Sequence, residues 1–306
     1  MTNSQKGYLS ALMAVLIWSG FILVSRFGTK SDLSAYDVIA IRYFVCASLL
    51  LPIWWFKYRF NLFNFKLLLI SLIGGLAYAL CVFRGFEMST ASHASLLLPG
   101  LMPVFIILMS VIINREVPSI EKWLGIGVIT LGVGVLMVQE LSMTQRLREG
   151  DLWLIAGAFC WSLFSILVKR WGITPWQVTV SLAVITCGLY LPVYFLWLPH
   201  TLSDASWPDI LIQAFYQGVL ATIIQMILYT RAIQLIGPAS TGAMMAFVPV
   251  FSGVSALIVF DESATRSLVL GLILVSVGAW LSHSRVVNEK LLSFGTQKMK
   301  KKSDHP

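Results

Sequence analysis

Arg42 is the most unusual residue of this chain, because it lies inside an apolar stretch long enough to cross a membrane. A charged side chain at the centre of a membrane helix costs about 2.5–3.5 kcal/mol on insertion scales, so Arg42 should face protein or water. One interpretation is contact with an anion or carboxylate near a central cavity. The other is structural: Arg42 extends to the interface or pairs with Asp37.

Three further polar side chains are spaced to share one helix face. Gln225 and Tyr229 are four residues apart, and Gln217 precedes Gln225 by eight. Amides in hydrocarbon need hydrogen-bonding partners, so this face should point into the protein. We expect it either to contact a substrate or to join helices. Tyr78, in another apolar segment, is a similar candidate that stands alone.

Several of the remaining candidates occur twice in the chain. Trp18-Ser19 recurs as Trp161-Ser162, and both tryptophans lie in the middle of their segments rather than in an interfacial belt. Pro103 and Pro249 each remove a backbone hydrogen bond, which predicts a hinge or a cavity wall. The residues around them could either line a substrate cavity or fill the protein core. They are Ser95 and its counterpart Thr241, Met102, Met244 and Met245.

These residues lie on elements that can only be membrane helices. The apolar fraction is 58% and the charged fraction 12%, against about 25% charged residues in soluble proteins. The apolar runs are continuous rather than alternating, which excludes a β-barrel and predicts an all-α integral membrane protein. Ten segments are long enough to cross, at 7–25, 38–56, 66–86, 94–113, 123–140, 152–168, 178–198, 211–230, 239–260 and 267–284.

The repeated motifs divide these segments into two sets of five. Residues 1–140 form the first repeat, 141–284 the second, and 285–306 a basic tail. Because five is odd, the two repeats must enter the membrane in opposite senses, as in many secondary carriers. Lys and Arg are concentrated in the loops that share a side with both termini, which predicts cytoplasmic termini. The basic tail then faces anionic membrane lipids rather than nucleic acid.

Glycines form stripes in the fifth and tenth segments. Gly125 and Gly132 are seven residues apart, as are Gly271 and Gly278, and such stripes let helices approach closely. Packing within the chain is one reading, and a homodimer through these two segments is the other.

The order of motifs resembles that of the EamA-type carriers of the drug/metabolite transporter superfamily. The resemblance rests on Pro103-Val104-Phe105, the Glu116 loop and the glycine-rich fifth segment, which recur as Pro249-Val250-Phe251, Glu262 and the tenth segment. It implies a ten-helix carrier of small metabolites in the inner membrane, often an exporter. It also implies a cavity lined mainly by the first, third, fourth, sixth, eighth and ninth helices.

The sequence therefore predicts a secondary transporter of small organic metabolites, with amino acids or related compounds as the first candidates and export as the expected direction. Efflux of hydrophobic drugs is the alternative. An integral-membrane enzyme or a channel is disfavoured, since hydrolase, metalloprotease and selectivity-filter motifs are absent. The four cysteines lie in apolar segments without CxxC spacing, so we expect no metal site and no cofactor.

Overall fold

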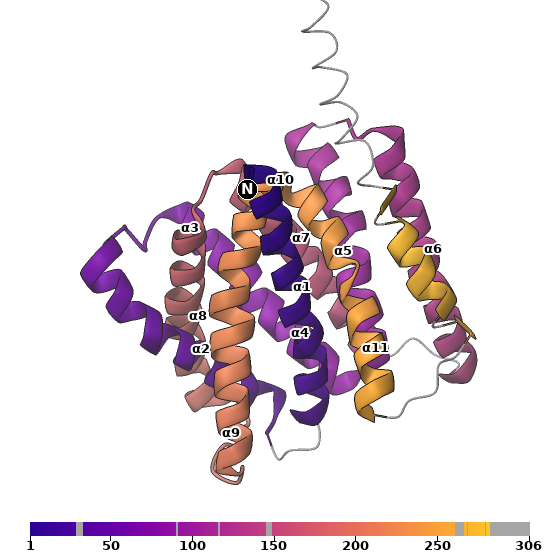
Figure 1. Cartoon of the computed structure of the whole chain (residues 1–306). Helices are drawn as coiled ribbons and strands as arrows, with labels where there is room; N and C mark the ends of the chain where they lie inside the picture. Colours follow the sequence, from indigo (N-terminus) through magenta and orange to yellow (C-terminus); the bar gives the residue numbers. More distant parts are fainter. Residues whose placement is uncertain are drawn as a thin grey trace, which may run out of the picture.

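The computed structural model describes residues 1–28, 33–89, 91–115, 117–144, 149–260, 266–267, 269–278 and 280–281. Within these ranges the chain is helical and has no strand. The predicted basic tail, 285–306, lies outside the described residues. Figure 1 shows the helices side by side in a single bundle. The helices are α1 Asn3–Gly28, α2 Ala35–Ile53, η1 Trp54–Tyr58, α3 Phe65–Ser71, η2 Leu72–Ala77, α4 Tyr78–Met88, α5 Ala91–Asn114, α6 Ile120–Thr144, α7 Glu149–Arg170, α8 Pro175–Trp197, α9 Trp207–Gln213, η3 Ala214–Ile224, α10 Gln225–Met245 and α11 Val248–Phe260.

Seven of the described helical stretches are long and apolar enough to span a membrane, and Val269–Gly278 is a shorter apolar helix. The sequence predicted ten spans, so this count confirms a membrane protein of several helices and leaves the number ten as a prediction. One stretch, Trp207–Met245, is 39 residues long, which exceeds a single crossing. Gly237 divides it, with φ 83° and ψ 161° just before Pro238. Glycine tolerates this positive φ, and the following proline disfavours helical geometry there.

The start of the second helix in each half is fixed by the same device. Ser34 caps α2 through a capping box with Asp37, and Thr174 caps α8 through a capping box with Gln177. In such a box each side chain satisfies a backbone N–H that the helix leaves unpaired. The third helix of each half changes from α-helical to π-helical geometry at the same place. α3 passes into the π-helix η2 after seven residues, and α9 passes into η3 after seven residues.

Equivalent helices of the two halves run in opposite directions. α2 and α8 are antiparallel, because the Tyr190 hydroxyl donates to the Tyr36 carbonyl at one end and Tyr58 stacks on Trp176 at the other. The beginning of α1 packs against the Leu235–Ile236 region of α10, whereas it is the end of α7 that reaches the same region through Lys169. The core lies where α1 and α7 meet the helices of the opposite half.

The two proline-containing segments differ. α5 runs unbroken from Ala91 to Asn114 through Pro99 and Pro103. The equivalent segment of the second half is interrupted at Ala246–Phe247, between α10 and α11, just before Pro249. The two predicted hinges therefore differ, because the helix is continuous at Pro103 and interrupted just before Pro249.

The glycine stripes pack against each other within the chain. A Cβ on Gly278 would lie 2.6 Å from the Gly125 carbonyl oxygen, and one on Gly132 would lie 3.0 Å from that of Gly271. Only glycines allow so close an approach of α6 and the 269–278 helix. Gly127 and Gly134, by contrast, have open space around their Cα atoms. A homodimer through these helices stays a prediction. Gly127 and Gly134 would be the positions open to a second copy of the chain.

Candidate binding site in the membrane core

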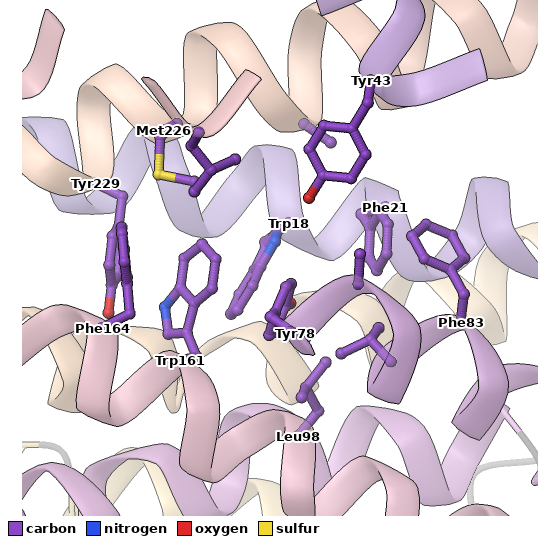
Figure 2. Close-up of a cluster of buried hydrophobic side chains, with 14 of the residues drawn as sticks. Trp18, Phe21, Tyr43, Tyr78, Phe83, Leu98, Trp161, Phe164, Met226 and Tyr229 are labelled. Atoms are coloured by element: carbon purple, nitrogen blue, oxygen red, sulfur yellow. The ribbon is translucent and has the colours of Figure 1, made fainter. Parts of the chain in front are cut away.

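The two repeated tryptophans meet at the centre of the bundle. The rings of Trp18 on α1 and Trp161 on α7 lie 5.1 Å apart, centroid to centroid (Figure 2). Trp161 also contacts Tyr78 at 4.6 Å, Tyr229 at 5.1 Å and Phe164 at 5.2 Å. Helices of both halves thus contribute to one aromatic cluster around Trp161. We expected a cavity lined by these side chains, and instead they are buried against one another.

Arg42 lies at one side of this cluster and is only 2% exposed. Its guanidinium carbon stands 6.0 Å from the ring centre of Phe21, 5.8 Å from that of Tyr43 and 5.8 Å from that of Phe83. Among the described residues it forms no ion pair, and its Nε has no hydrogen-bond partner. Aromatic faces attract a cation but do not satisfy its N–H donors.

Asp37 is not the counter-ion of Arg42. Its carboxylate accepts hydrogen bonds from Ser34, from the Tyr194 hydroxyl at 2.5 Å and from the Thr201 hydroxyl at 2.8 Å. These bonds tie the start of α2 to the loop after α8. The structural interpretations of Arg42, pairing with Asp37 or extension to the interface, are therefore both wrong in this structure.

Other polar atoms in the core also lack partners. Both amide atoms of Gln225 and the Tyr78 hydroxyl are buried without a hydrogen bond to any part of the chain that the structure describes. Most buried polar groups in folded proteins are paired, and an unpaired one costs about 1–3 kcal/mol. Arg42 and Tyr78 thus place unsatisfied donors at the aromatic cluster, and Gln225 adds an unpaired amide directly before Met226 of the same core.

The serines next to the two tryptophans join the halves in equivalent ways. The Ser162 hydroxyl donates to the Ala158 carbonyl and lies 3.2 Å from the Met102 carbonyl oxygen. The Ser19 hydroxyl lies 3.4 Å from the Val248 carbonyl oxygen. Each serine therefore reaches the carbonyl that directly precedes a proline, Pro103 or Pro249, in the opposite half.

The remaining predicted residues are less directly involved. Met102 and Met245 are buried in the same hydrophobic core, and Met244 packs at its edge. The Thr241 hydroxyl donates to Gly237 in its own helix. The Ser95 side chain lies outside the described residues. Gln217 is buried, but it lies in the π-helix η3, so the α-helical spacing used to place it on the face of Gln225 does not hold there.

Several residues of the cluster were not among the sequence candidates. Phe21, Phe83 and Phe164 surround Arg42 and Trp161, and the Ser165 hydroxyl is hydrogen-bonded to Tyr229 at 2.8 Å. Phe21 and Phe164 follow the repeated Trp-Ser pairs at equal spacing, so the repeat itself contained the signal. Phe83 and Ser165 are not part of a repeated motif, so the sequence did not single them out.

A helical membrane protein whose repeats cross at a buried cationic and aromatic cluster is of the transporter class, and the comparisons agree. The model of the EamA-like transporter family matches residues 5–138 and again residues 148–283. The chain belongs to the EamA-like transporter family.

Its relatives and one solved structure fit this assignment. An "uncharacterized inner membrane transporter", YicL of Salmonella typhimurium, is 25% identical over 90% of this chain and 94% of its own length. An uncharacterized transporter of Archaeoglobus fulgidus is 20% identical over 92% and 99%, and YyaM of Bacillus subtilis is 26% identical over 69% and 70%. A protein of known crystal structure shares the fold with a TM-score of 0.68 at 17% identity, covering 90% of this chain and 97% of that one.

Proposed function

We propose that this chain is a secondary transporter that moves a small carboxylate-bearing metabolite with an apolar or aromatic side group, such as an amino acid, by alternating access. The observation that supports this most is the buried Arg42, whose charge has no counter-ion among the described residues. A buried charge is expensive unless paired, so a carboxylate is the chemical group that this position lacks.

The other residues of the cluster suit the rest of such a substrate. Trp18, Trp161 and Tyr229 offer apolar ring surface. The Tyr78 hydroxyl and the Gln225 amide offer unpaired donors and an acceptor in the protein interior. The closely packed rings support a closed, substrate-free state, in which opening the interface between the halves would make room for cargo.

The proposed architecture has ten helices in two inverted repeats, 1–140 and 141–284, with both termini in the cytoplasm and the basic tail at the inner membrane surface. The antiparallel course of α2 and α8 supports the inversion. In this arrangement the bonds of Ser19 and Ser162 join the two halves near Pro249 and Pro103, where a pivot would lie. The expected direction is export.

The test is uptake or release by purified protein in liposomes, with matched pairs of compounds that differ in one charge. An amino acid with an aromatic side chain should be moved, and its carboxamide, which lacks the anion, should be moved at least about tenfold more slowly. Liposomes that move neither compound nor any other small solute would exclude the proposal.

Efflux of hydrophobic drugs is the second candidate, favoured by the aromatic character of the core. It predicts that lipophilic cations compete with the amino acid. A buried Arg42 repels cations. If only neutral or anionic compounds compete with the amino acid for transport, this alternative is excluded.

A further inference from the structure

A second site lies at the membrane surface, apart from the aromatic core. A pocket of about 350 Å³ opens between the η1–α3 connection and the turn between α7 and α8. Four membrane stretches end or begin around it, at Tyr58, Phe65, Arg170 and Pro175. It therefore lies where the hydrocarbon meets water, on the face predicted to be cytoplasmic. The lining residues that matter here are Asn61, Asn64, Lys66, Trp171 and Gln177.

The acceptors of these side chains are already occupied. The Asn61 Oδ1 accepts from the Phe63 N–H at 2.9 Å, and the Asn64 Oδ1 accepts from the Lys66 N–H at 2.9 Å. The Gln177 Oε1 accepts from Thr174, through both its N–H and its hydroxyl. Because a backbone N–H can only donate, each amide oxygen is held in place with its NH₂ group on the other side, and these three NH₂ groups form no hydrogen bond with the part of the chain that the structure describes.

The backbone around the pocket is occupied in the same way. The Phe60 carbonyl accepts from the Trp54 indole at 2.9 Å, and the Ile173 carbonyl accepts from the Gln234 amide at 2.8 Å. The pocket thus presents the amide NH₂ groups of Asn61, Asn64 and Gln177 and the ammonium of Lys66, which lies 6.0 Å above the Trp171 ring. No acidic residue is among its lining, and the sequence has none between Asp37 and Glu87.

Strongly exposed aromatic side chains flank the pocket residues Asn61, Asn64 and Lys66 in the sequence. Trp55, Phe56, Phe63 and Phe65 come from the same segment as the donors and are 57%, 80%, 84% and 72% exposed. Exposed aromatic rings at this depth are typical of contact with the lipid interface. A ligand that fits both parts has a compact oxygen-rich anion for the donors and an apolar portion that stays in the bilayer.

We propose that this pocket binds the phosphate headgroup of an anionic phospholipid, such as phosphatidylglycerol. The phosphate oxygens accept from the amide groups and from Lys66, as polar headgroups do in basic pockets beside membrane helices. The acyl chains lie along the exposed rings. None of the polar residues of this pocket belongs to the aromatic cluster around Trp161, although Leu67 and Ile173 in its lining are part of the same hydrophobic core.

Binding is measured as the rise in melting midpoint of the full chain, purified in detergent, on titration with phosphatidylglycerol, with phosphatidylcholine and inorganic phosphate as parallel arms. Phosphatidylglycerol should stabilise at lower concentration than phosphatidylcholine. Lys66→Gln should weaken this effect about fivefold, the contribution of one lysine near an anionic surface. Lys57→Gln, which removes the same charge from a residue outside the lining, is the matched control and should change it less than about twofold.

Gln177→Glu is the sharper variant. A glutamate at this position keeps the capping box with Thr174, so α8 should still fold, but it replaces a donor with a negative charge. We expect it to abolish the preference for phosphatidylglycerol while leaving the midpoint in phosphatidylcholine unchanged. Three results would overturn the proposal: equal effects of the two lipids, equal losses in Lys57→Gln and Lys66→Gln, or stabilisation by inorganic phosphate without any by phosphatidylglycerol.

Discussion

The indole rings of Trp18 and Trp161 meet across the boundary between the two halves, tilted by 35° with centroids 5.1 Å apart. They occupy equivalent positions in the repeat, yet their surroundings differ. Trp161 also contacts Tyr78, Phe164 and Tyr229. Equal positions in the sequence therefore have unequal roles in the structure.

From this difference we predict that Trp161→Phe weakens substrate affinity more than Trp18→Phe does. Loss of the indole N–H should raise the Kd about tenfold if a substrate accepts its hydrogen bond. Equilibrium binding to the purified variants measures this. An equal loss in both variants would assign the two rings to packing alone.

Arg42→Met should reduce transport of carboxylate-bearing substrates at least about tenfold while leaving the melting midpoint unchanged or higher. The charge has no ion pair among the described residues, so its removal frees the protein of a desolvation cost. Arg84→Met is the control, because Arg84 is partly exposed and pairs with Glu87. A large fall in midpoint for Arg42→Met would show that the arginine holds the fold together.

Gly150→Ala should destabilise the protein more than its repeat counterpart Gly7→Ala. A Cβ at Gly150 would lie 2.6 Å from backbone atoms of Met88 and Ser89, which cannot move aside. At Gly7 the nearest atoms belong to side chains, the Cγ2 methyl of Ile236 and the Cβ of Leu235. Overpacking of the first kind costs about 1–3 kcal/mol. Thermal unfolding checks the order, with Gly127→Ala, where nothing lies within 4 Å, as a control that should be neutral or stabilising.

Ser162→Ala and Ser19→Ala should each lower stability by about 0.5–1.5 kcal/mol through loss of a bond between the halves. The effect at Ser162 should be the larger, because its oxygen lies 3.2 Å from the Met102 carbonyl, against 3.4 Å for Ser19 and Val248. Ser10→Ala is the comparison, since the Ser10 hydroxyl donates only to Lys6 in its own helix. Identical midpoints in all three variants would remove these contacts from the interface between the halves.

Periodicity and repetition were enough to predict the helical class, the limits of most segments and the equivalence of Trp18 and Trp161, but not that their two rings meet. They were not enough where local winding changes. The π-helix η3 alters the spacing around Gln217, which no run of apolar residues reveals. Arg42 was recognised as unusual from its setting, but its surroundings depend on Phe21 and Phe83, which come from two other helices. Such contacts are set by tertiary packing rather than by local pattern.

The opposed course of equivalent helices has a consequence for how such a protein can be made. One half alone has one distribution of Lys and Arg, which favours one orientation in the membrane. Two copies of that half would form the central contact between tryptophans only if one copy inserted in the opposite orientation. Joining both halves in one polypeptide removes that requirement. Each then evolves charges suited to its own sense of insertion, and the two tryptophans are free to diverge in what they touch.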